Sequence, residues 1–349
     1  MGEAVPARQE FSDRAIVFRG CNGPQAFPAT AEDVPARPKH RDLRLPLQEL
    51  DLPLEPAHQW QPLIDTSGDA AAFRERYGNA DKRTVIRFLL LDGDNLNSVI
   101  SCLRAARENA RSIREIISSE MWEQVNSLYL RIQSQMSLAE SERLAELLRG
   151  IRLGCHMFEG ITDATMSYNE AWHFLRLGRQ LERADKTSRI LDVKYFMLLP
   201  SANAIGTPYD DIHWSAVLKS VSGFEMYRKK YGRIVPRSIV EFLILDREFP
   251  RAIRHCLRDA DESLHTITGT PMGSCECPSE CSLGPLRAEL DYISVNKIIK
   301  EGLHEYLDGL QERMNIIDDN LTRDFFAGES ESDSETAEEE EVSSSRAYK

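Results

Sequence analysis

The feature that most constrains this chain is an internal repeat with an offset of 154 residues. Of the 49 positions from 60 to 108, 14 hold the residue found 154 positions further along, without a gap, where chance gives about three identities. The copies of a duplicated helical unit usually pack about a pseudo-two-fold axis, so we expect two related halves that meet along one seam. The matched segments are Arg74-x-x-Tyr77-Gly78 with Arg228-x-x-Tyr231-Gly232, Phe88-Leu89-x-Leu91-Asp92 with Phe242-Leu243-x-Leu245-Asp246, and Cys102-Leu103-Arg104 with Cys256-Leu257-Arg258.

Apolar residues recur every three or four positions through both copies, which is the period of an α-helix that is buried on one side. Convincing strands with alternating apolar residues are absent. The sequence therefore predicts an all-α helical bundle built from two related halves. Helices are predicted over 82–91, 96–117, 119–136, 138–160, 166–199, 213–230, 236–245, 250–267 and 286–324.

The two ends of the chain differ in composition from its middle. Residues 1–45 contain five prolines and no sustained helical period, so we expect an irregular N-terminal segment. Residues 329–341 carry eight acidic residues and no basic one, and we expect 327–349 to form a disordered, solubilising acidic tail. The all-helical domain then spans 46–326.

The repeat also exposes a gap in the first half. A long helix is predicted over 168–195, and its counterpart would lie near 14–41, but that window is Pro-rich and dissimilar. Either the first copy has lost its opening helix, or the start or reading frame of the N-terminal segment is misassigned.

Composition excludes several classes of protein. The net charge of −13 argues against binding to a nucleic-acid backbone. No stretch approaches 18 apolar residues and no signal peptide is visible, so we expect no membrane span and a cytoplasmic location. Seven cysteines, an odd number, do not suggest a secreted disulfide framework. No Walker A loop, G-x-G-x-x-G or G-x-S-x-G motif is present, and no cofactor is expected.

Two segments resemble a known protein family. One begins Leu177-Gly178-Arg179-Gln180-Leu181-Glu182-Arg183-Ala184-Asp185, and the other begins Ser101-Cys102-Leu103-Arg104-Ala105-Ala106-Arg107-Glu108. They resemble the Alpha-E family, an all-helical domain named for its Glu-Arg motif, over about residues 50–326. Family members usually open with a helix that carries a first Glu-Arg motif, and this chain lacks it.

The resemblance implies which proteins this chain works with, but it does not imply a particular reaction. Genes of the Alpha-E family commonly neighbour circularly permuted ATP-grasp proteins and transglutaminase-like peptidases. This implies an accessory part in an ATP-dependent system that forms amide or peptide bonds, with an ATP-grasp-type ligase or its peptide product as partner.

The helix predicted over 168–196 carries a seam that changes from apolar to charged. Its members advance by three or four positions, the spacing of a packed helical interface. Asp185 and Arg189 can pair along the helix. Glu182 and Asp192 then need donors from other helices, because an unpaired buried charge is very costly. The seam comprises Ala171, Leu175, Gly178, Glu182, Asp185, Arg189, Asp192 and Phe196, and the candidate donors are Arg104, Arg107, Arg111, Arg183 and Arg258.

Three interpretations of these charges stay open. They form a structural salt-bridge network, a polar pocket for a ligand bearing a carboxylate or an amine, or a solvated face. Arg104, Glu108, Arg111 and Glu115 form a second pattern, which we interpret as an exposed ion ladder rather than a shared central site. The candidate binding residues are Arg179, Glu182, Arg183, Asp185, Arg189, Asp192, Arg104, Arg107, Glu108, Arg111, Arg258 and Glu262.

Other polar motifs receive a structural interpretation. Asp92 and Asp246 are predicted to be N-caps of the helices that follow them. The two E-x-x-H motifs, Glu170 to His173 and Glu301 to His304, are attributed to chance rather than to a di-metal site. Cys275, Cys277 and Cys281 lack a fourth zinc ligand and are taken as loop thiols, while Cys102 and Cys256 are expected to be small core residues.

The sequence thus favours an accessory or co-catalytic helical protein that binds a peptide or carrier through a charged seam between helices. One alternative is an enzyme in its own right, with Glu182 as the acid or base and arginines binding a carboxylate substrate. Another is a purely structural assembly module.

Overall fold

The computed structural model describes residues 60–136 apart from 62, 65, 66 and 68, and then residues 143–198 and 208–326. Within these ranges the chain forms α-helices and one short π-helix, and no strand, which confirms the all-α prediction. The predicted irregular segment 1–45, the window 14–41 and the predicted tail 327–349 lie outside the described residues.

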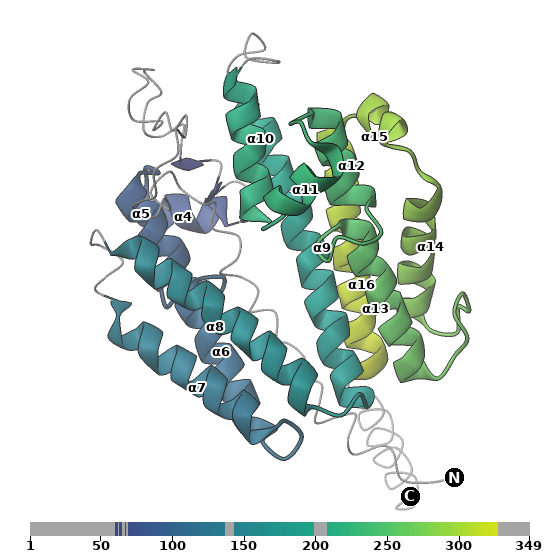
Figure 1. Cartoon of the computed structure of the whole chain (residues 1–349). Coiled ribbons are helices and arrows are strands. Elements are labelled where there is room, and N and C mark those ends of the chain that lie inside the picture. Colours follow the sequence, from purple (N-terminus) through teal and green to yellow (C-terminus); the bar gives the residue numbers. More distant parts are fainter. Residues whose placement is uncertain are drawn as a thin grey trace, which may run out of the picture.

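The first half of the described chain forms one group of helices, on one side of the molecule (Figure 1). α6, α7 and α8 pack in sequence against one another, as an antiparallel layer joined by short connections does. The members are α4 (Ala70–Tyr77), α5 (Lys82–Ile86), the π-helix η3 (Arg87–Leu91), α6 (Val99–Ser112), α7 (Ser119–Ser134) and α8 (Leu144–Thr165).

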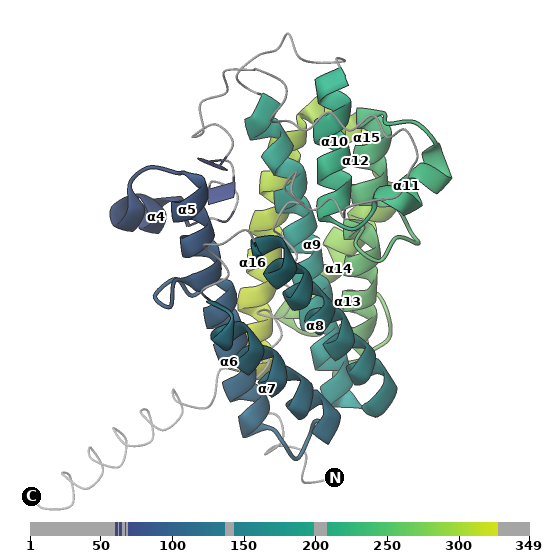
Figure 2. The same cartoon turned by 60° about the vertical axis from the view of Figure 1, so that its left-hand side comes forward.

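The second half forms a larger bundle, with the long helix α9 (Glu170–Leu198) between it and the first group (Figures 1 and 2). α9 packs more extensively on α13 than any other two elements pack on each other. The remaining members are α10 (Pro208–Ser220), α11 (Phe224–Tyr231), α12 (Pro236–Leu245), α13 (Ile253–Thr268), α14 (Pro278–Tyr292), α15 (Val295–Glu301) and α16 (Leu303–Phe326).

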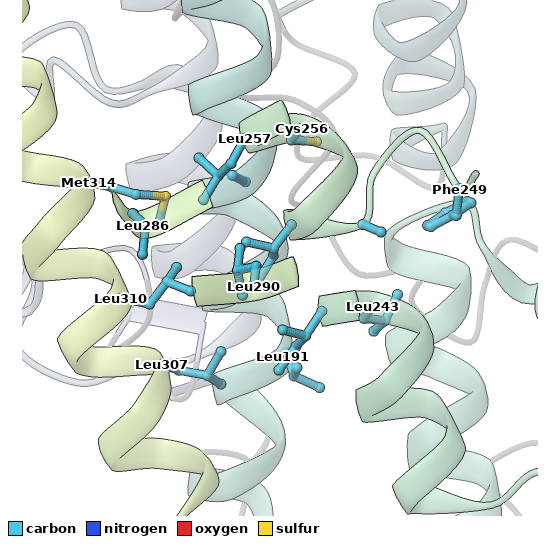
Figure 3. Close-up of a cluster of buried hydrophobic side chains, with 14 of the residues drawn as sticks. Leu191, Leu243, Phe249, Cys256, Leu257, Leu286, Leu290, Leu307, Leu310 and Met314 are labelled. Carbon is cyan, nitrogen blue, oxygen red and sulfur yellow. The ribbon is translucent and has the colours of Figure 1, made fainter. Parts of the chain in front are cut away.

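The two halves have separate apolar cores. One large cluster fills the second half, where Leu191 of α9, Leu257 of α13 and Leu310 of α16 converge (Figure 3). Burying each such leucine stabilises the fold by about 1.5–3 kcal/mol. Three smaller clusters fill the first half, and one of them takes in Ala171 at the start of α9, with Trp172 packed against it. α9 therefore begins in the core of one half and continues in the core of the other.

Two predicted helices are divided in the structure. The run at 213–230 is split between α10 and α11 at Ser222, whose φ of 54° lies in the left-handed region. The run at 286–324 becomes α14, α15 and α16. Ser294 caps the start of α15, and Gly302, with a φ of 101°, ends it.

The predicted N-cap role of Asp92 and Asp246 is wrong. Both residues end the helical segment before them, and the N-caps of α6 and α13 are Ser98 and Ala252. The Asp246 carboxylate accepts hydrogen bonds from two backbone N–H groups of the following loop, including that of Glu248 at 2.8 Å. These aspartates turn the chain between helices, which is a common use of Asp in loops.

Corresponding elements of the two halves begin at matching positions. α4, α5 and α6 begin at residues 70, 82 and 99, and α11, α12 and α13 begin 154 residues later, at 224, 236 and 253. Each half also contains a trio of rings in which the first two stack, with centroids 5.5 Å apart in one half and 5.0 Å apart in the other. The trios are Phe73, Tyr77 and Phe88 in the first half, and Tyr227, Tyr231 and Phe242 in the second.

Candidate functional site

The predicted charged seam lies on α9. Leu177, Ala184 and Leu191 of this helix are buried in the second-half core. The charged residues of the seam contact one another or residues of other helices. The charged part of the seam therefore consists of several separate ion pairs along α9.

Two of these pairs lie within α9 itself. Arg189 Nε donates to Asp185 Oδ2 at 2.8 Å, which confirms the predicted i,i+4 pair. Lys186 Nζ lies 3.3 Å from Glu182 Oε1 and 3.5 Å from Asp185 Oδ2. Burial acts to lower the pKa of Lys186, but the two carboxylates outweigh it and the pKa is raised. Glu182 was predicted to take a donor from another helix, and the structure places Lys186 of α9 against it.

Asp192 takes its donor from another helix, but the donor is an imidazole. His304 Nδ1, at the start of α16, lies 2.8 Å from Asp192 Oδ1. Burial raises the pKa of Asp192, against the opposing effect of this hydrogen bond. The prediction of a donor from outside the helix is correct for Asp192, and the prediction that it is one of five arginines is wrong.

Two arginines of α9 reach α8. Arg183 donates from Nη2 to Oε1 of Glu159, and Arg179 Nη1 lies 3.4 Å from the same oxygen and 3.6 Å from Asp163. Both guanidinium groups are largely buried, and the Nε atom of each finds no hydrogen-bond partner in the part of the chain that the structure describes. Burial lowers the pKa of Arg179, Glu159 opposes this effect, and Arg183 adds to it. Glu159 therefore shares its charge between two cations.

A third arginine, Arg251, joins this group from the loop before α13. The hydroxyl of Thr187 on α9 donates to its backbone carbonyl at 2.9 Å. Burial, and then the proximity of Arg183, lowers the pKa of Arg251 to about 10. Glu159 acts in the opposite direction, but within the described residues no ion pair or hydrogen bond joins the Arg251 guanidinium to a carboxylate. We call Arg179, Arg183 and Arg251 the arginine cluster.

Two cysteines lie beside the arginine cluster. Cys155 on α8 and Cys256 on α13 are both buried, and burial raises the pKa of each thiol to about 12. A thiol with such a pKa stays protonated at neutral pH and is a poor nucleophile. The prediction that Cys256 is a core residue is confirmed, whereas its counterpart Cys102 on α6 is only half-buried.

A second group of charges joins α9 to α13. Arg176 Nη2 lies 2.9 Å from Asp259 and 3.3 Å from Glu262, and the amide of Gln180 donates to Asp259 at 3.3 Å. Arg258 contacts Asp259 and Glu262 on its own helix. Glu262 therefore contacts α9 through Arg176. Arg258, which was predicted to donate to a carboxylate of α9, pairs with carboxylates of its own helix.

The predicted residues of α6 form a separate surface group. Glu108 accepts from Arg107 at 2.6 Å and from Arg111 at 3.0 Å. Arg107 also lies over the rings of Trp122 and Tyr129 on α7. Arg104 is exposed on the same helix. Of the predicted ladder, the structure shows the pair of Glu108 with Arg111.

The E-x-x-H motifs show no metal-binding geometry. His304 pairs with Asp192, and the His173 ring packs edge-on against Trp172 with centroids 5.0 Å apart. In the part of the chain that the structure describes, no three or more His, Cys, Asp or Glu residues are grouped as metal ligands.

The interpretation of the three clustered cysteines as loop thiols is wrong for two of them. Cys275 and Cys281 form a disulfide, and Cys277 remains a thiol. The loop doubles back because the Glu276 N–H donates to the buried Glu280 carboxylate at 2.8 Å. This brings the start of α14 against the segment before it, which cysteine spacing alone did not indicate.

Several residues of the site were missed at the level of sequence. Glu159 and Arg251 lie outside the seam and outside the segments that carry the family resemblance. Arg176 lies on α9 but is not a member of the predicted seam. One available signal was the apolar face of α8, which implied that one side of Glu159 meets another helix.

The comparisons with known proteins agree with the fold. Residues 40–326 match the model of the Alpha-E family, a predicted alpha-helical domain with a conserved ER motif. No curated protein and no solved structure matches the chain. None of the helices described here combines the length and the apolar character needed to cross a membrane. Because the family match covers most of its length, this chain belongs to the Alpha-E family.

Proposed function

We propose that this protein is an accessory component of an ATP-grasp-associated system that forms peptide or amide bonds. It holds a carboxylate of its peptide or carrier partner at the arginine cluster. The charged contacts of α9 with its neighbours supply the rest of the site. The family membership supports the context, and the geometry of the cluster supports the ligand class.

The observation that carries this proposal is the charge imbalance of the cluster. Arg179 and Arg183 share the carboxylates of Glu159 and Asp163, and Asp163 is half exposed to water. Within the described residues the Arg251 guanidinium contacts no carboxylate, and burial, followed by the proximity of Arg183, lowers its pKa to about 10 although Glu159 acts in the opposite direction. An anion bound beside it would relieve this cost, because arginine offers a planar fork of donors that matches a carboxylate.

A stand-alone enzyme has less support. Glu182 lies 3.3 Å from Lys186, and the raised pKa of that lysine keeps the ammonium group charged. The Glu182 carboxylate is thus engaged in an ion pair within its own helix. A purely structural role does not explain why the Arg251 guanidinium is buried without a contacting carboxylate among the described residues.

We also infer that the two halves derive from duplication of one helical unit. The matched starts of α4, α5 and α6 with α11, α12 and α13 support this, as do the two ring trios. A matched ion pair adds to it. Arg76 pairs with Asp92 at 3.2 Å, and Lys230 pairs with Asp246 at 2.7 Å, 154 residues further along.

The proposal is tested by titrating the full chain with tri-glutamate, an acidic peptide probe, and measuring heat release at low and moderate salt. We expect saturable binding that weakens by about tenfold or more in Arg251→Gln and Arg183→Gln, because each removes a charge-assisted donor. Arg247→Gln is the matched control, since this arginine is exposed in the same loop.

Two results would contradict the proposal. One is an affinity for tri-glutamate that is equal in wild type and Arg251→Gln. The other concerns the wider system: when the chain is reconstituted with an ATP-grasp ligase and its peptide substrate, Arg251→Gln should lower amide-bond formation. Full activity of a folded Arg251→Gln variant would show that the cluster does not hold the partner.

A further inference from the structure

The loop that leads into α14 holds three cysteines and one disulfide. Cys275 and Cys281 form the bond and are both exposed, whereas Cys277 keeps its thiol and is half-buried. Exchange requires a thiolate to reach one of the two sulfur atoms, so an exposed disulfide is more open to it than a buried one. This bond is therefore accessible to exchange, and a free thiol lies two residues from one of its halves.

Hydrogen bonds hold the segment around the disulfide as well. The N–H of Glu276 donates to the Glu280 carboxylate at 2.8 Å. The N–H of Ser279 donates to the carboxylate of Asp324 on α16 at 2.7 Å. The two bonded cysteines are only six residues apart, and a cross-link over a short segment removes the least chain entropy from the unfolded state. The bond can consequently change partners while the surrounding structure stays in place.

Cys277 and Cys281 lie about one helical turn apart. Cys277 is the N-cap of α14, and the N–H of Cys281 donates to the Cys277 carbonyl at 3.0 Å. The Cys277 sulfur lies 3.2 Å from Oγ of the buried Ser279, which keeps it beside the first turn. Four residues of α-helix rise about 6 Å, and a disulfide joins residues whose Cα atoms are about 4.4–6.8 Å apart. Cys277 can therefore bond to Cys281 without a large movement of the backbone.

We propose that Cys275, Cys277 and Cys281 form a thiol–disulfide exchange site whose substrate is the disulfide form of a low-molecular-weight thiol. In the first step Cys277 loses its proton to water and attacks Sγ of Cys281. The bond to Cys275 breaks, and Cys275 leaves as a thiolate that takes up a proton. One disulfide and one thiol are present before and after this step, so it needs no oxidant. It moves the thiol from a half-buried residue to an exposed one.

The exposed thiol of Cys275 then reacts with the substrate. As a thiolate it attacks one sulfur of the external disulfide, forms a mixed disulfide with that half, and releases the other half as a thiol. The external disulfide is the oxidant of this step, and the bond between Cys277 and Cys281 does not change. Cys155 and Cys256 do not compete, because both are buried and burial raises the pKa of each thiol to about 12. The proposal is independent of the arginine cluster.

The test incubates the full chain, purified without a reductant, with oxidised glutathione and determines which cysteine carries the glutathione. Free thiols are blocked with N-ethylmaleimide, and the denatured chain is cleaved after glutamate. Cleavage after Glu276 and Glu280 places the three cysteines on three different fragments, so mass spectrometry identifies each pairing. We expect glutathione on Cys275 and a disulfide between Cys277 and Cys281.

A serine variant tests the part played by Cys277. Cys277→Ser should lose the uptake of glutathione at Cys275, because the first step then has no nucleophile. Serine is a favoured N-cap, so we expect α14 to form in this variant, and circular dichroism checks the fold. Cys102→Ser is the matched control, since it removes another half-buried thiol, on α6, and should take up glutathione as the wild type does.

The fragment masses of the wild type decide the proposal even without the variant. It is overturned if glutathione is found on Cys277 while the bond between Cys275 and Cys281 persists, because Cys277 would then be an ordinary reactive thiol. It is also overturned if no glutathione is taken up, or if the untreated chain contains no disulfide among the three cysteines. Uptake at Cys275 by a folded Cys277→Ser variant would contradict it equally, since an external thiol rather than Cys277 would then have opened the bond.

Discussion

Replacing Arg251 by glutamine should make the unliganded protein more stable. The pKa of this guanidinium falls from 12.5 to about 10 in the fold. Each pKa unit corresponds to 1.36 kcal/mol, so keeping the charged form in place costs about 3 kcal/mol. Glutamine removes the charge and keeps a polar tip, but it loses part of the packing of the arginine stem. We therefore expect Arg251→Gln to raise the free energy of unfolding by about 1–3 kcal/mol.

Urea denaturation at neutral pH, followed by circular dichroism at 222 nm, measures this change. A rise in the denaturation midpoint without a change in slope is the expected signature. Arg247→Gln in the same loop should change stability by less than about 0.5 kcal/mol, because its side chain is exposed. A loss of stability in Arg251→Gln, or an equal gain in Arg247→Gln, would refute the reasoning that the charge of Arg251 is uncompensated.

Two further predictions follow from single sites. Burial raises the pKa of Asp192 above 3.8, so its contribution to stability is complete below that pH and is lost as pH rises through the higher folded-state pKa. Asp192→Asn should therefore gain stability relative to wild type as pH rises above 3.8, and a difference in urea midpoints that stays constant as pH rises would contradict this. Gly223→Ala should destabilise the fold by about 1–3 kcal/mol, because the new Cβ would lie 2.9 Å from the Phe249 ring. Gly160→Ala inside α8 should stabilise it by about 0.5–1 kcal/mol, because the new Cβ meets nothing within 4 Å. Thermal melts that rank the two variants in the opposite order would disprove this reasoning.

Helix periodicity predicted the fold class because helical apolar stripes are a local property. The run at 236–245 coincides with α12, where Pro236 fixes the first turn and Asp246 ends the helix. The breaks at Ser222 and Gly302 escaped prediction because they depend on backbone angles that tertiary packing imposes. The apolar period of a helix is a property of many residues together, so it does not reveal a single residue at which the helix ends.

The site could be predicted only in part. The pair of Asp185 with Arg189 is local to one helix, and the sequence indicated it directly. Glu159, Arg251 and His304 come from three other segments of the chain. Which charges meet across helices depends on the axial register of α8, α13 and α16 against α9, and the sequence does not specify that register.

The shared helix α9 gives the molecule a mechanical link. Its first turns pack among Ala106, Ile113 and Phe158 of the first half, and its later turns pack with Leu257 and Leu310 of the second half. Any small rotation of α9 about its axis must shift both ends together. A displacement at Arg179 or Arg183, near the middle of the helix, therefore shifts the side chains in both cores, because no loop interrupts α9 between them.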